Sequence, residues 1–459
     1  MAYCSDCFEK QLRIDELAEE NKRLKEQLRY RERKEQEGFF GASTPSSKAP
    51  FKKNAPEENA NNKGGGVPGH AGHGRAAHTE ETADEVVDLD VGNICPDCGG
   101  LLIEKEVRNR TVIESAAAKP RKILYHLSIK ECKDCRRAFR AKAPVLPKSL
   151  YGNQLTAQMA AMHYFHGMPM GRIVEMTGVN LGSVIDIFHR LGRYFEPIME
   201  PLKQEYRTAP VKHADETGWR NDGRSGYAWL FCTAALSIFL FKNTRSASVP
   251  KSVFGEESLP GVLVVDRYSG YNKAPCAIQY CWAHLLRDVE KLEKDSPDDE
   301  EVARFTGTLI PLLAQAMHLA SQKASDEEYY GQAHELKEKI MTVCRSPAHH
   351  LGARAIQDIF TTHEERLFHW ATDRRVPADN NRAERDLRPT VIARKVSFGS
   401  SSDAGAHTRS VLMSVLHTLN KRRGEDSLES VFKAALDEIA RNPEVDLIPL
   451  VLCPLPDPP

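Results

Sequence analysis

The pattern of apolar and polar positions changes several times along the chain. Residues 10–37 are dense in Glu, Lys, Arg and Gln, and apolar side chains recur there at alternating spacings of three and four residues. The apolar positions are Ile14, Leu17, Leu24 and Leu28. This spacing predicts a short coiled coil, in which the single polar position Asn21 favours a parallel, in-register dimer. A lone solvated helix is the alternative, because barely three heptads are marginal for an isolated coil.

Residues 208–278 have the texture of β-strands. Apolar or aromatic runs occupy residues 211–219, 227–232 and 237–242, and then 261–266. Asn221-Asp222-Gly223 is typical of a turn between the first two runs. The longest apolar stretch, residues 228–241, is shorter than the roughly 18 residues that a membrane span requires, so it predicts buried strands.

The segments on both sides of these strands are helical in pattern. Residues 168–176 predict one helix, Thr177-Gly178 a turn, and the following residues a second helix with Val184, Ile185, Ile187 and Phe188 on one side. This arrangement resembles a helix-turn-helix, whose second helix enters the major groove of DNA. Arg190 and Arg193 would then contact phosphates, but a helical hairpin that only packs is the alternative. Residues 282–372 are also helical and charged in pattern.

The composition describes an ordinary globular protein. The chain has 459 residues, 63 Lys and Arg against 64 Asp and Glu, 41% hydrophobic residues and 28% charged residues. This length predicts several domains, and the balanced charge means that any contact with nucleic acid must come from local patches. No secretory signal is recognisable, so we expect a cytoplasmic protein whose 11 cysteines are thiols or metal ligands.

Two Cys-x-x-Cys pairs predict a structural zinc site. Cys95 and Cys98 form the first pair, Cys132 and Cys135 the second, and four thiolates close a tetrahedral Zn²⁺ site. The 33 residues between the pairs predict a ribbon with a long loop. Basic residues near the second pair suit phosphate contacts, namely Lys133, Arg136, Arg137 and Arg140. The alternative is a zinc module that only stabilises its own small fold.

Three carboxylates stand where phosphodiester chemistry would need them. Asp215 lies within the first predicted strand, Asp266 ends the apolar strand Val262–Val265, and Glu384 lies in a predicted helix. Three such acids can share two divalent ions, Mg²⁺ or Mn²⁺, which activate the attacking oxygen and stabilise the leaving oxygen. Simpler interpretations remain: Asp215 precedes a turn, Asp266 caps the next segment, and Glu384 completes a capping box with Asn381 as N-cap.

The order of these elements is that of an RNase H-like core. Three antiparallel strands carry the first acid, a crossover leads to a strand with the second, and a helix carries the third. The first two acids are 51 residues apart, but 118 residues separate the second from the third, which predicts a helical insertion.

The fold class that follows is a multidomain α/β protein, with an N-terminal coiled coil, a zinc ribbon-like module, a helix-turn-helix-like segment and an RNase H-like catalytic core with a helical insertion. The predicted boundaries are 1–40 for the coiled coil, 41–92 for a flexible linker, 93–146 for the zinc module, 147–206 for the helix-turn-helix-like segment, 207–290 and 379–440 for the two parts of the core, 291–378 for the insertion and 441–459 for the tail.

Four motifs carry a specific family resemblance. They are Ala-Asp-Glu-Thr at residues 214–217, Val-Asp-Arg-Tyr-Ser-Gly-Tyr at 265–271, Cys-Trp-Ala-His-Leu-Leu-Arg-Asp at 281–288 and Asn-Asn-Arg-Ala-Glu-Arg-Asp-Leu-Arg at 380–388. With them the chain resembles the transposases of the bacterial insertion sequence 66 family. The resemblance implies a DDE triad on Asp215, Asp266 and Glu384.

The resemblance also implies an activity and partners. A transposase of this kind binds the ends of an insertion sequence, cleaves the phosphodiester and joins the 3′ hydroxyl to target DNA, with a homo-oligomer formed through the coiled coil and companion proteins encoded by the element. Near the triad, Arg388, Arg394 and Lys395 would hold DNA, while Trp282 and His284 would shape the site or simply pack. The competing interpretation is a non-catalytic, zinc-containing DNA-binding regulator.

Overall fold

The computed structural model describes residues 13–14, 16–21, 23–25, 28, 120, 122–131, 138–140 and 142–452. The four cysteines of the predicted zinc module lie outside the described residues, as do the linker, Lys133, Arg136, Arg137 and the side chain of Arg140. The described residues between 13 and 28 are helical, and their apolar side chains are exposed. An exposed seam suits either a coiled coil or a solvated helix, so the coiled coil remains a prediction.

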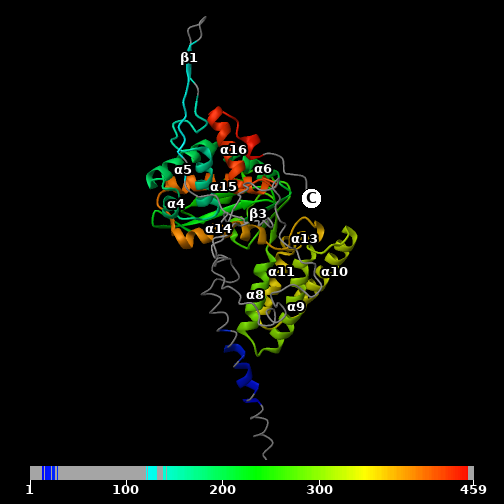
Figure 1. The fold of residues 1–459 in the computed structure, drawn as a ribbon. Helices are drawn as coiled ribbons and strands as arrows, with labels where there is room; N and C mark the ends of the chain where they lie inside the picture. The colour runs from blue at the N-terminus through cyan, green and yellow to red at the C-terminus, as the bar shows by residue number, and fades with distance from the viewer. Residues whose placement is uncertain are drawn as a thin grey trace, which may run out of the picture. The chain divides into compact units, whose positions relative to one another are not determined.

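A mixed six-stranded sheet forms the centre of the described chain (Figure 1). Its strands are β3 (Val211–Asn221), β4 (Arg224–Cys232), β5 (Ser237–Lys242), β6 (Val262–Val265), β7 (Ala277–Tyr280) and β8 (Gly399–Ser400). They run in the order β5-β4-β3-β6-β7, and β8 pairs with the far end of β3. The first three are antiparallel, whereas β6 and β7 run parallel to β3. The predicted three-stranded meander and crossover strand are therefore confirmed, and β7 is an addition.

The turn between β3 and β4 explains why the meander begins there. Asp222 and Gly223 both have positive φ, at 51° and 71°. Such angles at both central residues suit the right-handed twist of a two-residue hairpin, and an Asp-Gly pair tolerates them best.

The outer edge of the sheet is closed by a helix. Strand β5 would expose a row of backbone N–H groups, which invites pairing with another chain. Helix α15 (Asp403–Arg422) runs along this edge and offers a hydroxyl at every fourth position. The backbone N–H groups of Ser237, Phe239 and Phe241 donate to the side-chain oxygens of Thr418, Ser414 and Ser410 at 2.8–3.2 Å. The edge strand is thus satisfied by side chains instead of by another strand.

Helices on the N-terminal side of the sheet form a hairpin that packs on the core. Helix α4 (Met170–Thr177) ends at Gly178 in the left-handed conformation, and α5 (Leu181–Phe195) follows. Val184, Ile187 and Phe188 are buried as predicted, but the prediction for Ile185 is wrong because its side chain is 37% exposed. Helix α5 packs against α15. The hairpin is confirmed, and its role in reading DNA remains a prediction.

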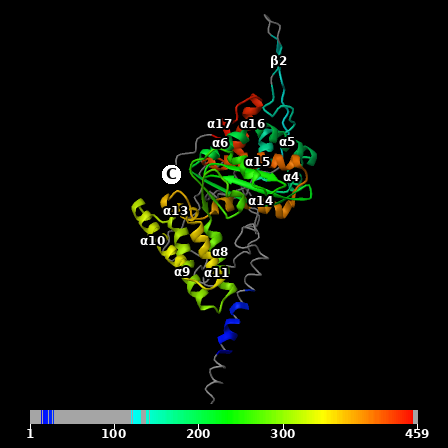
Figure 2. The same ribbon diagram turned by 180° about the vertical axis from the view of Figure 1, so that it is seen from behind.

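The remaining elements outside the insertion are mostly helices. They are β1 (Ile129–Glu131), β2 (Ala138–Arg140), α3 (Asn153–Ala160), the π-helical turn Ala161–Phe165, the 3₁₀ turn Glu196–Ile198, α6 (Met199–Thr208), α7 (Ser248–Phe254), the 3₁₀ turn Ser269–Tyr271, α14 (Asn381–Ser397), α16 (Leu428–Arg441) and α17 (Ile448–Val451). Helix α16 packs on α3, and Figure 2 shows α16 next to α15 from behind. None of the described helices has the length and apolar character to cross a membrane.

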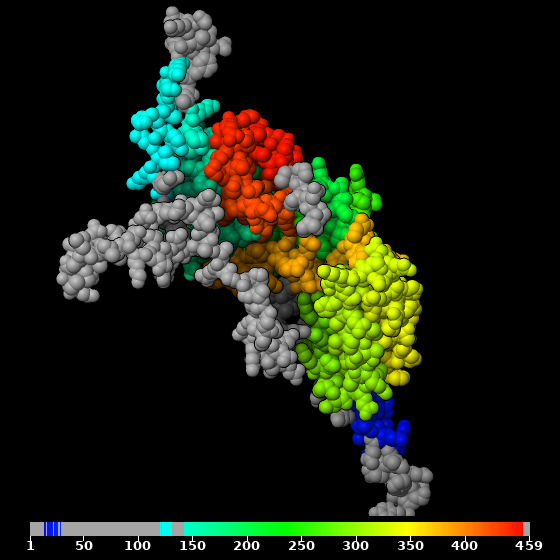
Figure 3. Space-filling model, turned by 45° about the vertical axis from the view of Figure 1, so that its right-hand side comes forward, coloured from blue at the N-terminus to red at the C-terminus, as the bar shows by residue number. Residues whose placement is uncertain are grey.

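A helical insertion separates β7 from α14. Its helices are α8 (Trp282–Asp295), α9 (Glu300–Leu319), α10 (Asp326–Arg345), α11 (Leu351–Thr362), α12 (Glu364–Leu367) and α13 (His369–Thr372). They form a continuous lobe in the space-filling view, coloured green to yellow (Figure 3). The sheet and the insertion belong to one compact unit.

An aromatic cluster anchors this insertion. The Trp282 ring makes edge-to-face contacts with Phe360, Phe368 and Trp370, with ring centroids 5.1–6.1 Å apart. Its indole N–H donates to the carbonyl of Leu367 at 2.8 Å, so its polar atom is satisfied although the side chain is fully buried. Trp282 is therefore a packing residue that joins α8 to α11 and α13.

We predict that Trp282→Ala destabilises the protein by about 3–5 kcal/mol, because it leaves a large cavity in the aromatic cluster. Chemical unfolding followed by fluorescence and circular dichroism measures the change. Leu150→Ala, at a side chain that is 95% exposed, is the control and should change stability by less than about 0.5 kcal/mol. Equal stabilities of the Trp282→Ala variant and the control would contradict the anchoring role.

Candidate active site

Strand pairing brings Asp215 and Asp266 together. Strands β3 and β6 are parallel, with Val211 opposite Val262 and His213 opposite Val264. Extended two residues past this paired segment, the same register brings Asp215 level with Asp266, which follows the last residue of β6. Neighbouring strands lie about 4.8 Å apart, and residues in one register row point to the same face. The spacing of 51 residues is therefore the register offset of the two strands.

Asp215 is buried in the middle of the sheet. Its Oδ1 accepts a hydrogen bond from the backbone N–H of Glu216 at 2.9 Å, whereas its Oδ2 is enclosed and has no hydrogen-bond partner in the described part of the chain. Burial raises the pKa of Asp215 well above its usual value, and the negative charges of Glu216, Asp266 and Glu384 raise it further. A buried carboxylate oxygen without a partner is costly unless a cation or proton meets it.

Asp266 follows the last residue of β6 and is also buried. Its Oδ1 accepts from the backbone N–H of Tyr268 at 2.9 Å. Burial and then the charge of Glu216 raise the pKa of Asp266 to about 7, against the opposing effects of that hydrogen bond and of Arg245 and Arg267. Asp266 is therefore poised to change its charge near neutral pH.

Glu384 reaches this cluster from the first turn of α14, and Asn380 fixes the start of that helix. The Asn380 side chain donates from Nδ2 to the carbonyl of Ala214 at 2.8 Å, and its Oδ1 lies 2.9 Å from Nδ1 of His213. Because Oδ1 can only accept, His213 carries its proton on Nδ1. The buried amide thereby ties the helix to β3, one residue away from Asp215.

The alternative capping-box interpretation of Glu384 is wrong. The helix begins at Asn381, so Asn380 and not Asn381 is the N-cap, and its side chain makes no capping bond. The carboxylate of Glu384 instead pairs with the guanidinium of Arg287 on α8 at 3.2 Å. The Asn380 side chain does not cap the helix because both of its polar atoms form hydrogen bonds to residues of β3.

Glu216 is a second buried acid that the sequence motif contained without an assigned role. Arg245 donates to its Oε1 from Nε at 2.9 Å and from Nη2 at 2.6 Å, and the hydroxyl of Tyr271 donates to Oε2 at 2.6 Å. The Tyr268 ring lies over the Arg245 guanidinium, 4.1 Å from ring centroid to Cζ. The two tyrosines of the Tyr-Ser-Gly-Tyr motif thus hold the loop after Asp266 against the Glu216–Arg245 ion pair, and these contacts form the Glu216–Arg245–Tyr271 lock. In the sequence, these two tyrosines were the only sign of such an interaction.

A comparison with known protein families gives a match that spans this site. A family model described as "Transposase IS66 family" matches residues 148–408, which include all three acids. The chain belongs to this transposase family. The uncharacterized protein y4qI of Sinorhizobium fredii is 25% identical over 405 residues, which are 78% of this chain and 72% of that protein.

The three basic residues near the triad that are predicted to hold DNA lie on α14 of this transposase, but they differ in their surroundings. Arg388 and Lys395 are exposed. Arg394 is half-buried, and its Nη1 donates to the carbonyl of Gly218 at 2.6 Å and to the hydroxyl of Thr217 at 3.1 Å. Arg394 therefore fastens α14 to β3, and Arg388 and Lys395 present charge to solvent.

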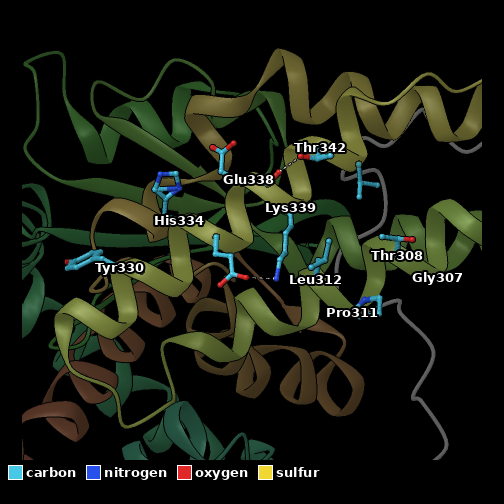
Figure 4. Close-up of a pocket in the computed structure, with 12 residues that line it drawn as sticks. Gly307, Thr308, Pro311, Leu312, Tyr330, His334, Glu338, Lys339 and Thr342 are labelled. Carbon is cyan, nitrogen blue, oxygen red and sulfur yellow. Dashed lines mark hydrogen bonds and ion pairs between the residues drawn. The ribbon is translucent and has the colours of Figure 1, made fainter.

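A separate groove of the transposase lies in the insertion between α9 and α10. Pro311 and Leu312 line it from one helix, and Tyr330, His334 and Lys339 from the other (Figure 4). None of Asp215, Asp266 and Glu384 contributes to it. The chemistry that the acids support is therefore not performed in this groove.

The raised pKa of Asp266 predicts a pH dependence of stability. A carboxyl group with a folded-state pKa of about 7, against 3.8 ordinarily, stabilises the fold below 3.8 and loses this contribution as the pH rises through 7. Without divalent metal, the melting temperature of wild type relative to Asp266→Asn should fall between pH 4 and pH 7, by the equivalent of a few kcal/mol. Thermal melts at constant ionic strength measure this difference, and a difference independent of pH would refute the burial effect.

Proposed function

We propose that this transposase is a DDE enzyme that cleaves phosphodiesters at the ends of an insertion sequence and joins the freed 3′ hydroxyl to target DNA. The carrying observation is the register of β3 and β6, which sets Asp215 beside Asp266 in the interior of the sheet. The strand order β5-β4-β3-β6-β7, with antiparallel and parallel pairs as described, is the order of an RNase H-like core and supports the proposal. Glu384 from α14 supplies the third acid.

The donor set fits two Mg²⁺ or Mn²⁺ ions. Asp215, Asp266 and Glu384 offer only oxygen, which is the ligand that hard divalent cations prefer. The enclosed, unpartnered Oδ2 of Asp215 supports the fit, since it lacks the hydrogen bond that a structural acid would make. When bound, the ions supply the positive charge that stabilises attacking and leaving oxygens in an in-line displacement.

The chain's own residues prepare the site for that role. Arg245 forms an ion pair with Glu216 and the hydroxyl of Tyr271 donates to it, so the lone pairs of Glu216 are used within the protein and the triad remains for cations. Asn380 and Arg394 fix α14 against β3, which holds Glu384 in place. Arg287 pairs with Glu384 while no cation is bound and would be released toward a phosphate when one is. These residues orient the acids, and we assign them no part in bond breaking.

The exposed face of α14 is proposed to hold the DNA. Arg385, Arg388 and Lys395 are exposed on this helix, which begins beside the triad. Cations along a single helix face suit the phosphate backbone. We also propose that the α4–α5 hairpin reads the element ends, that residues 1–40 join protomers, and that structural Zn²⁺ is held by Cys95, Cys98, Cys132 and Cys135.

We predict that Asp215→Asn abolishes DNA cleavage and strand transfer, with a loss of at least about 100-fold. The assay uses labelled DNA from the flanks of the gene with Mg²⁺ or Mn²⁺. Asp222→Asn, at an exposed carboxylate in the β3–β4 turn, is the matched control and should keep wild-type activity. Binding of element ends without cleavage by wild type, even with cell extract added, would favour the non-catalytic regulator.

We further predict that Arg388→Ala weakens binding of duplex DNA and lowers the slope of log affinity against log salt by about one. Arg354→Ala, at an exposed arginine of α11 in the insertion, serves as the control for the loss of one surface charge. Fluorescence anisotropy over a range of salt concentrations gives both slopes. Equal slopes for the two variants would contradict a specific role of the α14 face.

A further inference from the structure

A second set of metal-type donors lies next to the acid cluster. Cys281 is the N-cap of α8, His284 lies in the first turn of that helix, and Glu384 lies in the first turn of α14. One ligand atom from each side chain lies within 4.8 Å of the other two. The triangle joins the beginning of the insertion to the helix on which the chain returns to the core.

The hydrogen bonds at this triangle favour a metal over a packed core. The backbone N–H of Asn380 donates to Cys281 Sγ at 3.1 Å, and the backbone N–H of His284 donates to the same sulfur. Burial raises the pKa of the Cys281 thiol to about 12, and these two N–H donors act against that effect because they stabilise the thiolate. The Nδ1 atom of His284 is enclosed and has no hydrogen-bond partner among the described residues. An imidazole nitrogen that is buried without a partner is costly unless it meets a proton donor or a cation.

We propose that Cys281, His284 and Glu384 form a binding site for a divalent transition metal of the Zn²⁺ class. Sulfur, imidazole nitrogen and a carboxylate oxygen are the ligands that Zn²⁺ takes, whereas Mg²⁺ takes oxygen. Three protein ligands leave one position of a tetrahedral ion open to water or to a phosphate oxygen.

The size of the triangle suits such an ion. A point equidistant from corners 4.8 Å apart lies about 2.8 Å from each of them, so shifts of roughly 0.5–0.8 Å reach the Zn–S and Zn–N lengths of about 2.3 and 2.0 Å. The ion pair with Arg287 uses Oε1 of Glu384, so the second carboxylate oxygen remains for the ion. On binding, the thiol of Cys281 releases its proton to solvent, and the thiolate and carboxylate together balance the two positive charges.

This site does not require that the chain cleave DNA, and its test therefore reads metal content. It does share Glu384 with the proposed triad. A Zn²⁺ ion held by Cys281 and His284 would draw Glu384 away from Asp215 and Asp266, so Zn²⁺ and Mg²⁺ would compete for that side chain. The inference thus adds a metal of a different class beside the catalytic ions.

The experiment counts zinc in the full-length protein after exhaustive dialysis. Cys281→Ser and His284→Gln should each bind about one Zn²⁺ fewer per chain than wild type, because two remaining ligands do not hold the ion. Cys344→Ser removes another buried cysteine, on α10, and should bind as much zinc as wild type. Any zinc at Cys95, Cys98, Cys132 and Cys135 is common to all four proteins and drops out of the difference in zinc content. Equal zinc content in folded Cys281→Ser, His284→Gln and wild type would overturn the site.

If the variants do not fold, a measurement on wild type alone still tests the site. The X-ray absorption fine structure of the zinc-loaded wild type should contain a nitrogen or oxygen shell besides any sulfur shell, because this site contributes one sulfur, one nitrogen and one carboxylate. A shell of sulfur only would overturn the proposal. Loss of DNA cleavage in Asp215→Asn with unchanged zinc content would leave this site intact and test the proposed function separately.

Discussion

The buried pairing of two like charges on adjacent parallel strands is the constraint on which the rest of the structure depends. Asp215 and Asp266 occupy one register row of β3 and β6, away from water, and burial raises the pKa of both. Such a pair opposes folding at neutral pH unless protons or cations neutralise it. The neighbouring Glu216 would make the repulsion worse, and its bonds to Arg245 and Tyr271 offset that charge. The surroundings therefore tolerate an acid cluster whose remaining charge protons or cations can neutralise.

Hydrogen bonds between its two ends explain how a long insertion can interrupt the core without separating Glu384 from the other two acids. The chain leaves the sheet after β7 and returns at α14, and the two ends of the insertion are held together: the backbone N–H of Trp282 donates to the carbonyl of Ala378 at 2.9 Å, and that of Asn380 to Cys281 Sγ at 3.1 Å. Asn380 then binds β3. Glu384 consequently reaches Asp215 and Asp266 although it is remote from them in sequence. The insertion packs around its own aromatic cluster, and the hydrogen bonds of this junction do not involve the rings of that cluster.

Much of the core could be predicted from the sequence, because nearly continuous apolar runs and an Asp-Gly turn leave local signals. The meander, the crossover strand and the helical insertion are confirmed for this reason. Strand β7 was missed because four residues, with one exposed, carry too little pattern. The error at Ile185 arose because α5 packs along a narrow stripe, which leaves that side chain on its margin. The Glu216–Arg245–Tyr271 lock and the anchoring by Asn380 depend on contacts between distant segments, which no local pattern reveals.

The claim that Asp215, Asp266 and Glu384 share divalent ions is tested most directly by a crystal structure of the full-length protein soaked in Mn²⁺, with anomalous diffraction recorded at the manganese edge. The account predicts anomalous density bounded by the carboxylates of all three residues, with Oδ2 of Asp215 as a ligand. Manganese bound only at other acids of the chain, with Oδ2 of Asp215 still enclosed and unpartnered, would contradict it.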